Sequence, residues 1–117
     1  MARRCAIRKA EPLYSFEYVQ RVLDAYRVTP GTCGVARRAD RTFALELFER
    51  GVALEAVENA LVLAAARRML RSPASQPLNG IRSLAYFSPV INEVLSLPVD
   101  PAYFQHLRIR LARSRQR

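Results

Sequence analysis

Apolar residues recur at three- and four-residue spacing between the Gly- and Pro-containing stretches of this chain, and no segment of strand length alternates between apolar and polar residues. Residues 16–26, FEYVQRVLDAY, show the pattern clearly. Such spacing places apolar side chains on one face of an α-helix, whereas a half-buried strand needs a period of two. The chain also has no internal repeat. The pattern therefore predicts an all-α fold, a compact bundle of about five helices.

Capping residues set the expected ends of the first three helices. Ser15 is expected to cap the first helix, which covers about three turns. Asp40 is expected to cap the second, which ends at Gly51 because glycine readily takes the left-handed conformation that follows a helix. The third helix is expected from Leu54 to about Leu70.

Prolines shape the C-terminal third of the chain. Ser83 is expected to cap a fourth helix that contains Pro89. We expect a kink there, or two short helices of which the second is capped by Ser88. Asp100 followed by Pro101 predicts the start of a last helix, because proline fits the first helical position.

Loops and charged ends complete the expected organisation. Residues 27–38 form either a linker or an ordered loop, and residues 72–80 form a second loop. The domains expected are a basic N-terminal arm (1–14), a helical domain (15–111) and a basic C-terminal tail (112–117).

The apolar faces of the helices predict the core. Tyr14 and Tyr18 are expected to pack rather than to stack on bases, and the same holds for Tyr86 and Phe87, at least one of which lies on the apolar side. The other residues expected to be buried are Phe16, Val19, Val22, Leu23, Tyr26, Phe43, Ala44, Leu47, Phe48, Leu54, Val57, Leu61, Ala64, Ala65, Leu84, Val90, Ile91, Tyr103, Phe104, Leu107 and Leu111.

Positive charge is concentrated at the two ends. The 117 residues include 19 basic and 10 acidic side chains, a formal charge of +9. Residues 1–14 carry four basic side chains and one acid, and residues 101–117 carry five arginines and no acid, which leaves a net +1 for the residues between. Eighteen of the basic residues are arginines, whose planar guanidinium suits bidentate contacts with phosphate.

A near-neutral body with basic ends is suited to contacts with a nucleic-acid backbone rather than to reading base sequence. We expect the last helix to be the main binding element, because its apolar face would hold it on the body. Arg67, Arg68 and Arg71, at the end of the third helix, are expected only to complement the helix dipole. The residues expected to contact nucleic acid are Arg3, Arg4, Arg8, Arg37, Arg38, Arg108, Arg110, Arg113, Arg115 and Arg117.

Other classes of site lack their characteristic residues. Cys5, Cys33 and the single histidine, His106, do not make a zinc site of familiar spacing, and the two cysteines are expected to be reduced. No paired acid–base groups are recognisable, so we expect no enzymatic activity, no cofactor and no metal. No apolar run spans a membrane and no signal core follows the basic N-terminus, which predicts a cytoplasmic protein without membrane contacts.

The second and third helices have the length of a DNA-binding helix-turn-helix, with Gly51 in the turn. However, Leu47 occupies the position four before this glycine, where a small residue usually lets the helices cross closely. Glu55 and Glu58 would moreover face phosphates at the start of the second helix of the motif. These residues favour an ordinary αα-hairpin over a groove-reading motif.

Residues 81–95, IRSLAYFSPVINEVL, resemble the end of small helical domains in bacterial and phage replication-initiation and primosome-loading proteins, the DnaD-like group. Residues 49–64 look like the helical hairpin that precedes it, so the resemblance covers roughly residues 40–96. It implies DNA contacts partly in the C-terminal helix and tail, here the arginine-rich residues 104–117. The residues that match the pattern Ile-x-Ser-x-x-Tyr-Phe-x-x-x-Ile are Ile81, Ser83, Tyr86, Phe87 and Ile91.

We therefore expect a non-enzymatic nucleic-acid-binding protein of a mobile-element or phage-like replication or maintenance system, which contacts the backbone of DNA or RNA. One alternative is a small helical assembly subunit of a larger nucleoprotein machine, such as an RNA-guided effector complex. Another is a plain protein-interaction module, which would never bind nucleic acid. In each case the small core favours a protein partner or a homo-oligomer.

Overall fold

The computed structural model describes residues 14–71, 78, 80–96 and 101–115, apart from the side chains of residues 114 and 115. These residues form five α-helices and one short 3-10 helix, which confirms the all-α fold predicted from the apolar spacing. The elements are α1 (Ser15–Val28), α2 (Arg38–Glu49), α3 (Leu54–Met69), η1 (Leu84–Phe87), α4 (Ser88–Ser96) and α5 (Pro101–Arg115).

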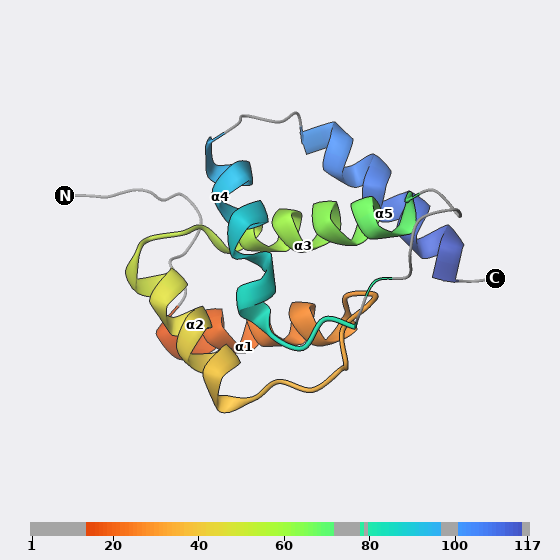
Figure 1. The fold of residues 1–117 in the computed structure, drawn as a ribbon. Helices are drawn as coiled ribbons and strands as arrows, with labels where there is room; N and C mark the ends of the chain where they lie inside the picture. The colour runs from red at the N-terminus through yellow and green to blue at the C-terminus, as the bar shows by residue number, and fades with distance from the viewer. Residues whose placement is uncertain (1–13, 72–77, 79, 97–100, 116–117) are drawn as a thin grey trace.

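Helix α3 crosses the middle of the molecule, with α1 and α2 on one side and α4 and α5 on the other (Figure 1). Helix α2 packs on α1, and η1 contacts α2, α3 and α4. Because α1, α4 and α5 all pack on it, α3 is buried on more than the single face that its sequence predicted. The additional buried residues on α3 are Ala60, Leu63 and Ala66.

Helices α2 and α3 do not form the αα-hairpin expected from their short connection. Gly51 follows the end of α2 with a φ of 79°, as predicted. Among the described residues, however, α2 packs mainly on α1 and η1, and α3 on α1, α4 and α5. Since a helix-turn-helix needs its two helices packed together, this arrangement does not provide one.

The observed helix starts differ from the predicted caps at Ser15 and Ser88, which are already helical, and agree with the prediction at Pro101. The residue that precedes α1 is Tyr14, and Ser15 is already helical. Helix α4 begins at Ser88, so Pro89 lies in its first turn, where the missing N–H breaks no helical bond. Helix α5 begins at Pro101 as expected, and its predicted cap, Asp100, lies outside the described residues.

Asp40 is buried rather than a surface cap, with only 2% of the residue exposed. It lies in the first turn of α2, and Arg37 is the residue that precedes the helix. Its Oδ2 accepts a hydrogen bond from the backbone N–H of Arg37 at 2.9 Å, and its Oδ1 accepts one from the backbone N–H of Leu84, also at 2.9 Å. The carboxylate therefore joins the start of α2 to the start of η1.

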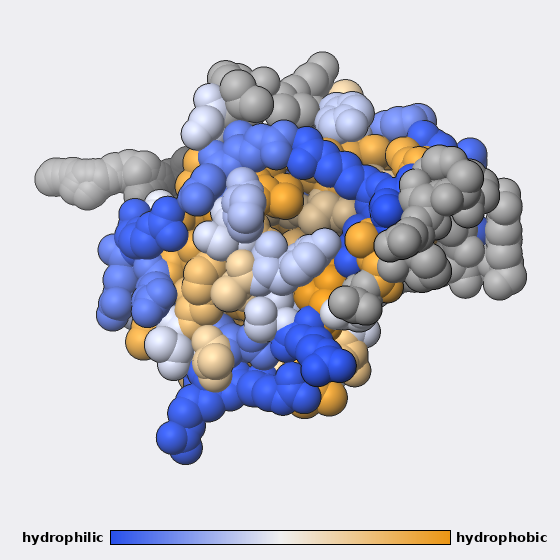
Figure 2. Space-filling model, in the orientation of Figure 1, coloured by the Kyte–Doolittle hydropathy of each residue, from blue (hydrophilic) through white to orange (hydrophobic). Residues whose placement is uncertain are grey.

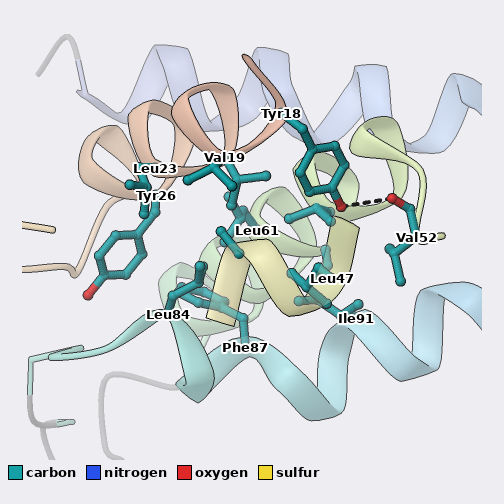
Figure 3. Close-up of a cluster of buried hydrophobic side chains, with 14 of the residues drawn as sticks. Tyr18, Val19, Leu23, Tyr26, Leu47, Val52, Leu61, Leu84, Phe87 and Ile91 are labelled. Atoms are coloured by element: carbon teal, nitrogen blue, oxygen red, sulfur yellow. Dashed lines mark hydrogen bonds between the residues drawn. The ribbon is translucent and has the colours of Figure 1, made fainter. Parts of the chain in front are cut away.

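The main core is a cluster of 16 buried residues between α1, α2, α3, η1 and α4, and Figure 3 shows its centre. Tyr18 donates a hydrogen bond from its hydroxyl to the carbonyl oxygen of Val52 at 2.7 Å. The ring of Tyr26 packs edge-on against Phe87, with 6.1 Å between the ring centroids. A second, separate group, here called the α5 cluster, holds α5 on α3 and consists of Leu63, Ala66, Phe104 and Leu107.

Four aromatic residues that were expected to pack are exposed, namely Tyr14, Phe16, Tyr86 and Tyr103. Phe16 and Tyr103 lie at the edges of their apolar stripes, and successive helical residues point about 100° apart. Tyr103 is thus about half exposed, whereas its neighbour Phe104 packs on α3. For the adjacent Tyr86 and Phe87, the expectation that at least one is buried is confirmed by Phe87.

Candidate nucleic-acid interface

Helix α5 presents arginines on a helix whose other side is fixed to α3. Phe104, Leu107 and Leu111 are all buried, at successive spacings of three and four residues. Arg110 and Arg113 are exposed and lie three residues apart, so they are neighbours on the outer side of the helix. We call these two residues the α5 surface. The helix extends to Arg115, four residues into the segment predicted as a tail.

Arg108 was expected to contact phosphate, but the fold gives it a structural partner. Its Nη2 donates a hydrogen bond to Oδ1 of Asn59, on α3, at 2.6 Å, and its side chain is partly buried. A guanidinium committed to a neighbouring helix is a weaker phosphate ligand than an exposed one. Arg108 therefore helps to fix α5 on α3, and its contact with phosphate stays a prediction.

Arg37 and Arg38 lie at the start of α2, where both are exposed. The Nη1 of Arg37 donates to the carbonyl oxygen of Arg82 at 3.3 Å, which brings a third exposed arginine to the same place. The sequence did not indicate Arg82, because 45 residues separate it from Arg37. We call these three residues the Arg37 surface.

Half of the residues predicted to contact nucleic acid have side chains that the structure does not describe. Arg3, Arg4, Arg8 and Arg117 lie outside the described residues, as does the side chain of Arg115. The N-terminal arm as a binding element therefore stays a prediction.

The fold also creates a basic cleft that the sequence did not indicate. The last turn of α3 and the start of the 84–96 segment enclose about 380 Å³. The aromatic residue that lines this cleft is Tyr86, of which 46% is accessible. We call it the Tyr86 cleft, and its lining residues are Ala64, Arg67, Arg68, Arg71, Leu78, Tyr86 and Val90.

Arg68 and Tyr86 contact each other in this cleft. The guanidinium carbon of Arg68 lies 5.9 Å from the centroid of the Tyr86 ring, within the range of a cation–π interaction. Nη1 of Arg68 also donates to the hydroxyl of Tyr86 at 3.2 Å. Gly31 lies beside the same guanidinium at a φ of 96°, and a Cβ on it would come within 3.0 Å of Arg68 Nε. Glycine thus lets the 29–37 loop approach the cleft.

That loop is ordered by a contact with the segment before η1. The N–H of Ile81 donates to the carbonyl oxygen of Gly31 at 2.8 Å, and the N–H of Cys33 donates to the carbonyl oxygen of Ile81 at 3.2 Å. These bonds make a single parallel bridge at Thr32. The Arg37 surface and the Tyr86 cleft are therefore parts of one face, built on the same pair of segments.

One acidic residue borders the cleft. Glu93, on α4, accepts hydrogen bonds from both terminal nitrogens of Arg67, one of them at 2.9 Å. The hydrogen bonds from Arg67 lower the pKa of Glu93, and the same bonds raise the pKa of Arg67. The Arg67–Glu93 pair is therefore nearly neutral, and Arg68 and Arg71 line the same cleft.

Figure 2 shows the molecule in the orientation of Figure 1, coloured by the hydropathy of each residue. Strongly hydrophilic side chains lie above and below a paler area, with apolar atoms visible within it, over η1 and the start of α4. Basic groups next to accessible apolar and aromatic surface are typical of proteins that bind single-stranded nucleic acid.

Other kinds of site find less support in the described part of the chain. No three His, Cys, Asp or Glu residues gather there in a group that could hold a metal ion. Cys33 is exposed and has a free thiol, and Cys5 lies outside the described residues. None of the helices in this part of the chain has both the length and the hydropathy to cross a membrane.

No protein-family model, curated protein or solved structure matches this chain. The resemblance of residues 40–96 to DnaD-like domains stays a prediction.

Proposed function

We propose that this is a non-enzymatic protein that binds nucleic acid through backbone contacts from exposed arginines. The observation that carries the proposal is the attachment of α5, whose buried face leaves Arg110 and Arg113 exposed at fixed spacing. A helix already held in place loses little conformational entropy when its side chains meet phosphates, whereas an unanchored arm must order its backbone as well. Residues 101–117 contain no acid that would oppose a polyanion.

The setting of this activity follows from the resemblance of residues 40–96 to DnaD-like domains, and we place the protein in a mobile-element or phage-like replication or maintenance system. The polymer is DNA or RNA, because the proposed contacts are with phosphate, whereas the 2′-OH of the sugar is what distinguishes RNA from DNA.

A binding titration tests the proposal. Labelled single- and double-stranded DNA and RNA of one length are titrated with the full chain at several salt concentrations. If about 4–6 phosphates are neutralised on duplex DNA, the logarithm of the binding constant falls with the logarithm of salt at a slope of about −4 to −5. A flat salt response, or no binding at low salt, contradicts the proposal and favours the interaction module or an assembly subunit that needs its partners.

A matched pair of variants tests the role of α5. Arg110→Gln with Arg113→Gln should reduce the steepness of the salt dependence by about 2, since each phosphate contact contributes about 0.9. The control removes the same charge from the opposite part of the molecule, with Arg21→Gln and Arg50→Gln, both exposed. If the two double variants lose equal affinity, net charge rather than α5 determines binding.

A further inference from the structure

The Tyr86 cleft differs from the α5 surface because it combines guanidinium groups with an accessible aromatic ring. We propose that this cleft binds one unpaired nucleotide of a single strand, with the base against the ring of Tyr86 and the adjacent phosphates on Arg68 and Arg71. The inference rests on the proposed function and adds to it a preference for single strands.

The ring of Tyr86 is held in place while much of it stays accessible. Its hydroxyl accepts the hydrogen bond from Arg68, and its edge packs on the neighbouring ring of Phe87, with centroids 5.2 Å apart and planes at 82°. Phe87 is itself fully buried in the main core. A ring fixed in this way loses little freedom when a base stacks on it, so more of the stacking energy appears as affinity.

The charges in the cleft favour a phosphate despite an opposing helix end. The C-terminus of α3 carries the equivalent of about half a negative charge, which disfavours anions. Three arginines line the cleft, namely Arg67, Arg68 and Arg71, and the one acid described at its border, Glu93, pairs with Arg67. Arg71 is exposed at the rim, and the cleft volume of about 380 Å³ lies within the usual range for small-ligand pockets.

Base-paired nucleic acid does not fit this arrangement. In a duplex both faces of each base are covered by its neighbours, so a ring inside a cleft can reach a base only after unstacking, which costs a few kcal/mol. Bases in a single strand are accessible, and every base has a face that can stack on an aromatic side chain. The cleft should therefore bind single strands more tightly than duplexes, with little dependence on base sequence.

Fluorescence can observe the stacking directly, because the chain contains no tryptophan. In Tyr86→Trp the only indole lies in the cleft. Single-stranded oligothymidylate and oligouridylate should quench its emission, whereas an abasic oligodeoxyribonucleotide of equal length and a duplex should quench it far less. The control is Leu45→Trp, with an exposed indole on α2, a helix that contributes no residue to the cleft.

Two further variants separate the ring from the hydroxyl. Tyr86→Leu should weaken binding of oligothymidylate about 5- to 100-fold, the range expected for one stacked base, and leave binding of the abasic strand unchanged. Tyr86→Phe keeps the ring and should change neither affinity by more than about two-fold. Thermal unfolding of each variant verifies that the fold is intact.

The outcomes distinguish this inference from the function on which it rests. If the protein binds strands but Tyr86→Leu weakens base-containing and abasic strands equally, or the indole is quenched equally by both, the stacking site is wrong and backbone binding stands. If the unmodified protein binds no strand even at low salt, both proposals are wrong.

Discussion

The main core and the α5 cluster differ in size and in how they are tied together. The main core contains 16 buried residues from five helices and the segments that connect them, and buried polar groups such as Asp40 and the Tyr18 hydroxyl join these parts. The α5 cluster contains four buried residues, and a hydrogen bond from Arg108 to Asn59 supports it. Val90 and Val94 of α4 pack against both clusters. The comparison teaches that the arginines of α5 are carried by the less extensively packed part of the molecule.

The largest expected effect comes from the centre of the main core. Phe87→Ala removes a fully buried ring that contacts Tyr26 and should lower the free energy of unfolding by about 3–5 kcal/mol. Urea unfolding followed by circular dichroism measures the change. A loss below about 1 kcal/mol would mean that the ring does not occupy the position described.

The second test concerns the carboxylate that joins α2 to η1. Asp40→Ala leaves the backbone N–H groups of Arg37 and Leu84 without this acceptor, and each loss costs about 1–3 kcal/mol. Asp40→Asn keeps one acceptor oxygen and should lose less stability than the alanine variant. Equal stability of the wild type and both variants would disprove the link.

Alkaline pH should weaken the main core through its two buried tyrosines. Burial raises the pKa of Tyr18 and of Tyr26 to about 12, above the ordinary value of 10. Their contribution to stability is therefore complete below pH 10 and is lost as the pH rises through 12. Absorbance at 295 nm should show two of the five tyrosines ionising together with unfolding. Tyr18→Phe with Tyr26→Phe should remove that coupled step.

A smaller global effect is expected in the α5 cluster. Phe104→Ala removes a ring of similar burial to Phe87, but α5 can detach while the main core stays folded, and this limits the loss to about 2 kcal/mol or less. Hydrogen exchange should show lost protection in α5 and unchanged protection around Val22 and Leu61. Simultaneous loss in both regions would show instead that the molecule unfolds as one cooperative unit.

The smallest expected effect is on strand binding and concerns α4, the helix that packs against both clusters. Glu93→Gln removes the acid that neutralises Arg67 and should tighten binding of single strands roughly two-fold at low salt, as one screened charge near a phosphate allows. High salt should abolish the difference.

The ion pair between Arg67 and Glu93 should also make stability depend on pH. Because the pKa of Glu93 is lowered, the pair contributes to stability above the ordinary pKa of a glutamate, and this contribution is lost as the pH falls through the lowered value.

Features that depend on local chemistry could be predicted from the sequence. Gly51 takes a positive φ at the end of α2, and Pro101 begins α5, because each residue restricts its own backbone. Helical spacing likewise placed Phe104 and Leu107 on a buried face.

Features that depend on distant partners could not be predicted. Helical spacing shows which face is apolar but not which element covers it, so Asp40 gave no indication of its bond to Leu84, 44 residues away. The same limit applies to the candidate site, where Arg68 meets Tyr86 only because η1 folds back along α3. The exposure of Tyr86 beside the buried Phe87 is likewise set by that contact and not by their adjacent positions.

The central place of α3 restricts how this chain can evolve. Its middle contains the buried small residues Ala60, Ala64, Ala65 and Ala66, with helices packed on more than one side. A larger side chain at any of them must displace a neighbouring helix, at a cost of about 1–3 kcal/mol against a total stability of about 5–15 kcal/mol for a typical domain. In a saturation library selected for folding, these four positions should retain the smallest amino acids, whereas exposed positions on α5 should accept almost any residue.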